Sequence, residues 1–217
     1  MIDFSIMPSL ECDLRCSFCM YDASPENKTE LDYEKTREFV AKWDFSAINN
    51  VGFYGGEPSI NFVLYQKFID LLPKVPKFVI TNGAWSTSVD RTEAFIEFIY
   101  DNDLYTIISG TKEHKMYQNE GVLRAIKENA YNMIRLKDGD VIHKMGRGKD
   151  YPGAMDKCSG FCCLDDRITR LAIMPDGNIV FQNCHGNYPI VQTIEDPFEG
   201  ILERTMNAVK NCGLKLL

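Results

Sequence analysis

The feature that most limits the fold of this chain is a repeated alternation of apolar strand-like runs and amphipathic helical segments. The strand-like runs lie at residues 2–7, 51–54, 78–80, 104–108 and, more weakly, 141–143. The helical segments lie at 31–43, at 62–72, from Ser88 onward, and at 122–133, where apolar residues recur at helical spacing. Thr29 is the expected N-cap of the first helix. Such strand–helix units predict parallel strands joined by right-handed crossovers.

Polar residues directly follow four of these strands. The first strand leads into a loop with three cysteines, and the second leads into Gly55-Gly56-Glu57-Pro58. Asn82 follows the third strand and Ser109 follows the fourth. The carboxyl ends of parallel strands form the rim where active sites lie, so we expect these loops to converge. Taken alone, the two glycines would favour an ordinary tight turn, and Asn82 and Ser109 are as typical of turns as of a cofactor contact.

The cysteine loop carries Cys12, Cys16 and Cys19 at C-x-x-x-C-x-x-C spacing. Thiolates are soft ligands that select zinc, copper(I) or iron–sulfur clusters. A four-iron cluster normally takes four cysteines, so three in one loop would leave one iron open to a small molecule. A structural zinc site closed by a distant fourth ligand is the alternative. A Cys-x-x-Cys redox pair would not need the third cysteine.

The other five cysteines lie in the last third of the sequence: Cys158, Cys162, Cys163, Cys184 and Cys212. They flank a strong hairpin signal, in which Pro175-Asp176-Gly177-Asn178 separates the apolar runs 171–174 and 179–182. Asp196 is the expected N-cap of a last helix, with Pro197 as its first residue. Five thiolates exceed what one cluster needs, and zinc is again an alternative.

The cysteine loop resembles the cluster-binding loop of the radical S-adenosylmethionine (radical SAM) enzymes. That loop has an aromatic residue before its last cysteine, and Phe18 stands at this position. The run from Gly55 to Pro58 is identical to the GGEP motif of the same family. The resemblance implies a 4Fe–4S cluster on Cys12, Cys16 and Cys19, with S-adenosyl-L-methionine on its open iron. It also implies that Gly55, Gly56, Glu57 and Pro58 seat the methionine end of this cofactor, with Phe18 near the adenine and further contacts from Asn82 and Ser109.

The last third is similar to the twitch or SPASM extension of some radical SAM enzymes, which binds an auxiliary cluster. In that pattern Cys163 precedes the hairpin and Cys184 follows it, with Cys158, Cys162 and Cys212 as further candidate ligands. The expected fold is α/β, an abbreviated partial (β/α) barrel of about five parallel strands with a C-terminal β-hairpin plus helix extension. The expected domains are 1–144 for the barrel and 145–217 for the extension.

Charge and hydropathy exclude several classes of function. The 217 residues carry a net charge of −7, which argues against non-specific nucleic-acid binding. No apolar run approaches the roughly 20 residues that span a bilayer, and the N-terminus lacks a signal-peptide pattern. Many cysteines without a secretion signal indicate a cytoplasmic protein with reduced thiols. The resemblance implies a flavodoxin-like or ferredoxin-like electron donor.

The resemblance to twitch and SPASM enzymes predicts a radical SAM enzyme that modifies a peptide or protein side chain. The alternatives are a small metabolite or nucleotide substrate, or activation of a glycyl radical enzyme. The abbreviated barrel favours a bulky substrate because its cleft would be open. A non-enzyme alternative is a zinc-stabilised binding module, which explains the cysteines but not the GGEP motif. No catalytic side chain is assigned.

Overall fold

The computed structural model describes residues 1–72, 75–129, 133–137, 142, 145–152, 154, 169–182 and 188–211, with side chains up to residue 208. The strands are β1 (Ile2–Ile6), β2 (Ile48–Phe53), β3 (Lys77–Thr81), β4 (Leu104–Ile108), β5 (Ile134–Leu136), β6 (Thr169–Ile173), β7 (Asn178–Phe181) and β8 (Ile190–Thr193). The α-helices are α1 (Tyr33–Val40), α2 (Phe62–Ile69), α3 (Val89–Asp101), α4 (Lys112–Lys115), α5 (Glu120–Asn129) and α6 (Ile201–Asn211). The 3₁₀ turns are η1 (Phe45–Ala47), η2 (Pro58–Ile60), η3 (Ala84–Thr87) and η4 (Gly146–Asp150).

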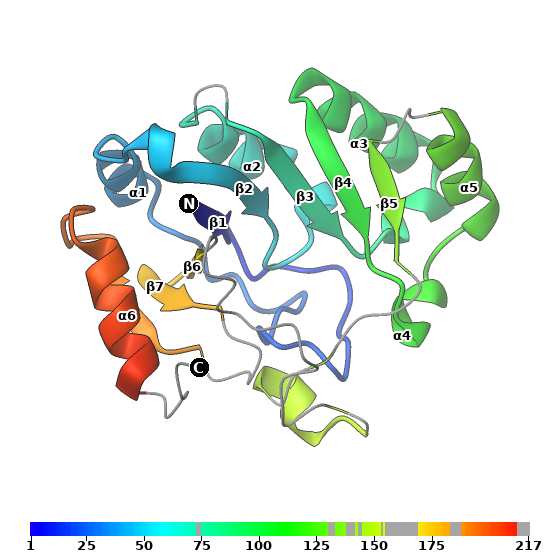
Figure 1. Cartoon of the computed structure of the whole chain (residues 1–217). Coiled ribbons are helices and arrows are strands. Elements are labelled where there is room, and N and C mark those ends of the chain that lie inside the picture. Colours follow the sequence, from blue (N-terminus) through cyan, green and yellow to red (C-terminus); the bar gives the residue numbers. More distant parts are fainter. Residues whose placement is uncertain are drawn as a thin grey trace.

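The described strands form one sheet in the order β5-β4-β3-β2-β1-β6-β7-β8. Neighbouring strands are parallel from β5 to β6, whereas β7 is antiparallel to both β6 and β8. The sheet curves, with α6 near the hairpin at one side and α5 near β5 at the other (Figure 1). Within the described residues β5 and β8 are the two edges and do not pair, so the sheet is an open partial barrel. The predicted α/β fold with its C-terminal hairpin and helix is confirmed.

The core lies between the sheet and the helices that cover one of its faces. Phe4 in β1 pairs with Val51 in β2 and Leu171 in β6, and all three side chains are fully buried. Helices α1, α2 and α3 each add large buried side chains to the same core. Each such side chain contributes roughly 1.5–3 kcal/mol by its removal from water. Burial of these large apolar side chains therefore determines which face of the sheet packs on the helices.

Helices α1, α2 and α3 each begin at a side chain that accepts a hydrogen bond from the first turn. Asp32 caps α1 through the backbone N–H of Lys35 at 3.0 Å, Asn61 caps α2, and Ser88 caps α3 as predicted. The prediction that Thr29 caps the first helix is wrong. The helix begins at Tyr33, and Thr29 instead uses its carbonyl to accept from the N–H of Leu10 at 2.9 Å.

The fifth strand and the last helix begin at other residues than predicted. Helix α5 ends at Asn129, before the predicted end of the helix, and β5 follows with Ile134 and Leu136. The apolar–polar alternation of this short strand is not evident in the sequence, because Met133 just before it continues the helical spacing. Residues 141 and 143 lie outside the described residues, and Ile142 is not in a strand. Asp196 accepts from the N–H of Thr193 at 2.8 Å and closes a turn after β8, so α6 begins later than predicted.

Both predicted segments contribute to the one sheet. Residues up to 144 supply β1–β5, and the later residues supply β6–β8, with β6 paired to β1. The division at residue 144 stays a prediction. In the part of the chain that the structure describes, no helix combines the length and apolarity needed to cross a bilayer.

Removal of the Asp32 cap should destabilise the protein, whereas the same change at Thr29 should not. We expect Asp32→Ala to lower the free energy of unfolding by about 1 kcal/mol, because an N–H of the first turn of α1 loses its acceptor. Thr29→Ala should stay within about 0.5 kcal/mol of wild type. Urea unfolding of both variants checks this, and equal losses would contradict the assignment of the cap.

Candidate metal and cofactor site

The cysteine loop is held in shape by its own backbone. It follows β1, and its two halves pair through the N–H of Cys12 to the carbonyl of Ser24 at 3.2 Å. The N–H of Ser24 returns to the carbonyl of Leu10 at 3.1 Å. A further bond joins the N–H of Leu31 to the carbonyl of Pro8 at 2.9 Å, at the base of the loop. The loop is therefore an ordered platform at the carboxyl end of β1.

The three thiols of this loop are free and lie in largely apolar surroundings. Cys16 is buried, Cys12 and Cys19 are half-buried, and Leu14, Phe18, Ala84, Ile142 and Tyr151 pack around them. Burial, followed by the neighbouring Cys19 and Glu113, raises the pKa of Cys16 to about 12. Burial, followed by Glu57, raises the pKa of Cys12 above its ordinary range. These two thiols therefore stay protonated near pH 7 unless a metal cation takes the place of the protons.

The GGEP motif lies directly against the cysteine loop. The N–H of Gly56 donates to the carbonyl of Ser9 at 2.7 Å, and the N–H of Glu57 donates to the carbonyl of Glu11 at 2.9 Å. A Cβ atom on Gly56 would lie 1.8 Å from the Glu11 oxygen. Gly55 has a φ of +126°, and a Cβ atom there would lie 2.7 Å from the Ser9 oxygen. The two glycines are therefore needed because the backbones of the two loops touch.

The carboxylate of Glu57 points into the protein and joins the motif to the end of β3. It accepts from the hydroxyl of Thr81 at 2.7 Å, from the N–H of Asn82 at 2.8 Å and from the N–H of Ser59 at 3.1 Å. Burial, followed by the Asp13 carboxylate, raises its pKa to about 7 although these hydrogen bonds lower it. All three of these donors belong to the protein, so Glu57 positions the motif. Its predicted contact with the cofactor stays a prediction.

Pro58 and Phe18 are both buried beside this contact. Pro58 is the first residue of η2, where its missing N–H costs no hydrogen bond. The ring of Phe18 packs edge-on against His114 and Tyr151, with centroids 5.0 and 5.6 Å away. Through Phe18, the cysteine loop thus packs against α4 and against the residue that follows η4. Its predicted position near the adenine stays a prediction.

Asn82 reaches the cysteine loop through its side chain. Its Nδ2 lies 3.8 Å from the sulfur of Cys12 and 2.8 Å from a carboxylate oxygen of Asp13. The other oxygen of Asp13 pairs with Arg91 of α3 at 2.6 Å. The third-strand loop, the cysteine loop and α3 are therefore connected by one chain of polar contacts.

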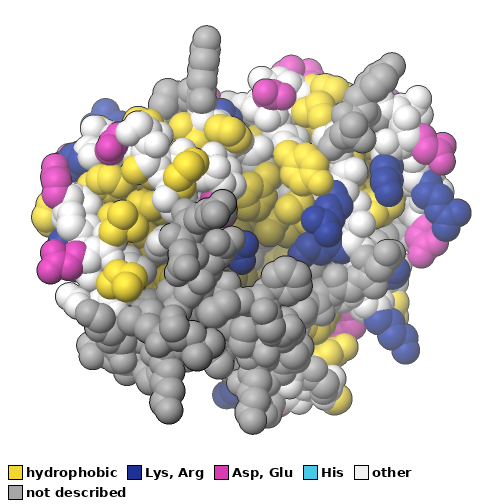
Figure 2. Space-filling model, viewed as in Figure 1, with side chains coloured by type: hydrophobic (Ala, Val, Ile, Leu, Met, Phe, Trp, Pro, Cys, Tyr) yellow, Lys and Arg dark blue, Asp and Glu magenta, His cyan; other side chains and the backbone are white. Residues whose placement is uncertain are grey.

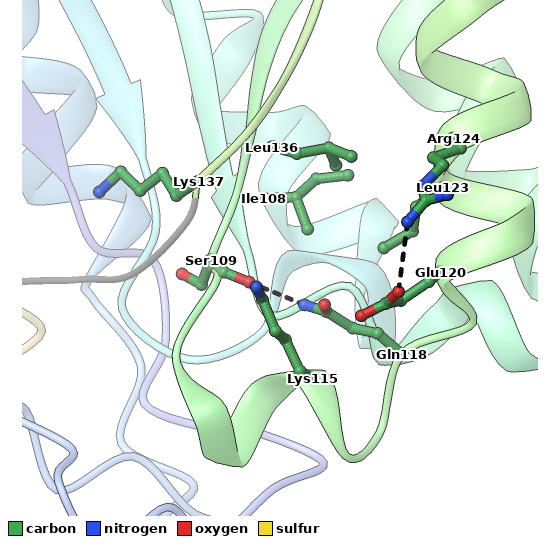
Figure 3. Close-up of a pocket in the computed structure, with 9 residues that line it drawn as sticks. All are labelled: Ile108, Ser109, Lys115, Gln118, Glu120, Leu123, Arg124, Leu136 and Lys137. Atoms are coloured by element: carbon green, nitrogen blue, oxygen red, sulfur yellow. Dashed lines mark hydrogen bonds and ion pairs between the residues drawn. The ribbon is translucent and has the colours of Figure 1, made fainter.

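Ser109 lies past the end of β4, beside a cavity of about 140 Å³ between β4, β5, α4 and α5 (Figure 3). Its N–H donates to the carbonyl of Thr81 at 2.9 Å, and its own carbonyl accepts from Gln118 at 2.7 Å. Gln118 also donates to the carbonyl of Asn82 at 2.6 Å. Ser109 thus shares this rim with Asn82, but neither of its two hydrogen bonds reaches the cysteines.

Arg147 braces the cysteine loop, a role that the sequence did not indicate. Its Nε donates to the carbonyl of Cys16 at 2.9 Å, and its Nη2 donates to the carbonyl of Ala23 at 2.5 Å. Its own N–H donates to the carbonyl of Cys19 at 2.9 Å. Gly146 has a φ of +50°, and a Cβ atom there would lie 2.6 Å from the carbonyl oxygen of Met20. The Gly-Arg-Gly run was the available signal, but its contact partner lies about 130 residues earlier.

A second brace comes from α4. The Glu113 carboxylate accepts from the N–H of Ser17 at 3.0 Å and from the Ser17 hydroxyl. Ser17 lies between two of the three cysteines. The loop is thus held by the GGEP motif after β2, by α4 and by η4. The predicted auxiliary ligands Cys158, Cys162, Cys163, Cys184 and Cys212 lie outside the described residues.

The donor arrangement can be compared with the two candidate metal centres. Within the described residues, no three His, Cys, Asp or Glu side chains converge as ligands of a single metal ion. Three thiolates on one zinc ion need that convergence, because each zinc–sulfur bond is about 2.3 Å long. An iron–sulfur cluster offers several irons, so its thiolates can bind apart from one another. Three free thiols in apolar surroundings are the donors that an iron–sulfur cluster takes, with one iron left open.

No protein-family model matches the sequence, and the comparison with curated protein sequences found no match. Solved structures do match. The structure of BtrN in complex with AdoMet and 2-DOIA aligns with a TM-score of 0.63 at 16% identity, over 96% of this chain and 85% of that chain. The structure of anSMEcpe with bound AdoMet and Cp18Cys peptide aligns with a TM-score of 0.56 at 13% identity, over 96% and 82%. The chain shares its fold with both of these structures.

In this fold, the predicted rim is present. The cysteine loop follows β1, the GGEP motif follows β2, and Asn82 follows β3, all at the carboxyl edge of the parallel strands. Figure 1 shows the blue cysteine loop beside the ends of these strands and near α4. The backbone contacts between the first two loops and the side-chain contact of Asn82 confirm that the three loops meet.

The closeness of the GGEP motif to the cysteine loop predicts that Gly56 tolerates no side chain. Gly56→Ala should lower the free energy of unfolding of the metal-free protein by about 2–3 kcal/mol, because its Cβ would overlap the Glu11 backbone. Gly121→Ala in α5 is the matched control, since its Cβ would meet nothing closer than 3.4 Å. It should leave stability unchanged or raise it by about 0.5–1 kcal/mol. Urea unfolding of both variants measures this, and a harmless Gly56→Ala would contradict the contact.

The brace from Arg147 predicts a local effect on the cysteine loop. Arg147→Met should speed hydrogen exchange of the amides of Cys12, Cys19 and Ser24 about tenfold, because the loop loses two side-chain bonds to its carbonyls. Lys149→Met removes the same charge from the exposed side of η4 and should leave these amides unchanged. Exchange monitored by mass spectrometry checks both variants. Equal exchange in the two variants would mean that Arg147 does not hold the loop.

Proposed function

We propose that this protein is a radical SAM enzyme. Cys12, Cys16 and Cys19 would hold a 4Fe–4S cluster, and S-adenosylmethionine would bind beside it. The observation that carries this proposal is the direct backbone contact between the three-thiol loop and the GGEP motif. A zinc-stabilised binding module would need the thiols but has no use for a glycine pair packed against them.

The residues of this chain would bind and shield the cofactors. The GGEP residues would seat the methionine end, Phe18 would pack near the adenine, and Asn82 and Ser109 would add contacts. When bound, the cluster supplies the electron that breaks a carbon–sulfur bond of S-adenosylmethionine, giving methionine and a 5′-deoxyadenosyl radical. The apolar residues Leu14 and Ala84 would keep water from the reacting centre. The radical would take a hydrogen atom from substrate and leave as 5′-deoxyadenosine.

The substrate proposed first is a peptide or protein side chain. The face of the sheet opposite the helices supports this, because it carries apolar groups and is open between β5 and β8 within the described residues. The ring of Phe78 lies over Gly52, and Tyr105 on the next strand is 40% exposed. Figure 2 shows hydrophobic side chains gathered beside lysine and arginine side chains near the middle of this view. An open, partly apolar face suits a chain segment better than a small polar metabolite.

A small-molecule substrate is the second candidate. The BtrN structure contains 2-DOIA, whereas the anSMEcpe structure contains a peptide, and this chain covers most of each. For either substrate we propose a cytoplasmic enzyme reduced by a flavodoxin-like or ferredoxin-like protein. The C-terminal cysteines would hold an auxiliary cluster, as in twitch and SPASM enzymes.

Anaerobic reconstitution with iron and sulfide tests the class of enzyme. The wild-type protein should release 5′-deoxyadenosine from S-adenosylmethionine in the presence of dithionite. Cys16→Ala should lose one cluster's iron and sulfide and reduce this release at least about 100-fold, because the remaining two thiolates cannot hold the cluster. Iron, sulfide and nucleoside assays on both proteins are the measurements. Zinc in place of iron with no nucleoside released would support the binding module instead.

Deuterium transfer separates the two substrate classes. The reconstituted enzyme is incubated with a perdeuterated extract of host cells, divided into a peptide and protein fraction and a small-molecule fraction. Deuterium should enter 5′-deoxyadenosine from the peptide and protein fraction, because the radical abstracts a substrate hydrogen. Mass spectrometry of the nucleoside measures the transfer. As a control, the peptide and protein fraction is digested with a protease and then dialysed to remove the fragments, and this treatment should abolish the deuterium transfer. Transfer from the small-molecule fraction alone would contradict the peptide proposal.

A further inference from the structure

The amide of Asn82 lies between a carboxylate and a proposed cluster ligand. Its Nδ2 donates to Asp13 at 2.8 Å and lies 3.8 Å from the sulfur of Cys12, within hydrogen-bonding range for sulfur. An amide nitrogen has two hydrogens, so it can serve both acceptors. Asn82 is only 6% exposed, which keeps competing water away from these bonds.

The orientation of this amide is determined by its other contacts. Its Oδ1 accepts from the N–H of Ala84 at 2.8 Å, which requires the oxygen on that side and the nitrogen toward Cys12. The backbone of Asn82 is held as well, because its N–H donates to Glu57 at 2.8 Å and its carbonyl accepts from Gln118 at 2.6 Å. The donor therefore faces the sulfur in a rigid setting.

Acidic side chains lie near Cys12, and the Asn82 amide donates a hydrogen bond among them. Two carboxylates lie beside this site, and Asn82 donates to both of them: its Nδ2 to Asp13 at 2.8 Å and its N–H to Glu57 at 2.8 Å. Arg91 pairs with Asp13 at 2.6 Å but is 39% exposed at its side chain, so water screens part of its effect. The Asn82 amide is a buried donor to this sulfur from outside the cysteine loop.

We propose that Asn82 is a positioning residue that raises the reduction potential of the cluster by donating a hydrogen bond to Cys12. This inference rests on the proposed function. Hydrogen bonds to cluster sulfurs stabilise the reduced, more negative state, and so make reduction easier.

Two substitutions of similar size test the proposal. Asn82→Leu removes the donor, and Asn82→Asp replaces it with a carboxylate while keeping an oxygen for the N–H of Ala84. Redox titration of the reconstituted cluster, followed by electron paramagnetic resonance, is done without S-adenosylmethionine so that contacts to that cofactor do not contribute. Asn82→Leu should make the reduction equilibrium about tenfold less favourable, which is 59 mV for one electron. Asn82→Asp should lower the potential further because of its added charge.

Asn61→Leu is the matched control. Asn61 also caps a backbone N–H, that of Leu64 at 3.1 Å, so its loss costs similar stability. The potential of this variant should equal that of wild type. Equal potentials for wild type, Asn82→Leu and Asn82→Asp would overturn the proposal even if the enzyme cleaves S-adenosylmethionine normally. A wild-type protein that takes up no cluster would instead overturn the proposed function, so the two failures are distinguishable.

Discussion

The site depends on the contact between the backbones of two loops that end neighbouring strands. The N–H groups of Gly56 and Glu57 bond to carbonyls of the cysteine loop, and only glycine leaves room for this approach. Because β1 and β2 are parallel and paired, both loops begin at the same edge of the sheet. The sheet brings the loops near each other, and the glycines allow them to touch. Without that contact, the thiols and the GGEP motif would be separate features.

The same contact brings acidic groups together in a buried place. Glu57 and Asp13 lie near Cys12 and both disfavour a thiolate there, and Asp13 also disfavours a negative charge on Glu57. Burial raises the pKa of Glu57 to about 7 and that of Cys16 to about 12, so protons keep the metal-free site close to neutral. A cationic metal centre would replace the thiol protons, and the sulfonium of the proposed cofactor would add a positive charge. The electrostatics of the site thus favour occupation by cationic groups.

Local patterns in the sequence were enough to predict the parallel strands, the hairpin and the loops at the rim. They failed where the deciding contact was distant or where two patterns overlapped. Met133 has the spacing of a helix and also precedes the alternation of Ile134 and Leu136, and pairing with β4 decides in favour of a strand. The Gly-Arg-Gly run marks the position of Arg147 but not its role, because its acceptor, the carbonyl of Cys16, is supplied by the fold. The amide of Asn82 is a similar case, since turn chemistry alone explains an asparagine after a strand.

The C-terminal extension is packed onto this site as well as onto the sheet. Gln182, after β7, donates to the hydroxyl of Tyr54, the residue before Gly55. The ring of Tyr54 lies 5.9 Å from that of Tyr21, two residues after the last loop cysteine, and Tyr21 lies 6.4 Å from Tyr188 of the extension. Tyr21 of the cysteine loop, Tyr54 beside the GGEP motif and Tyr188 of the extension thus form one aromatic cluster. A shift of the extension would therefore reach the proposed cofactor site through direct packing, whatever its own cysteines bind.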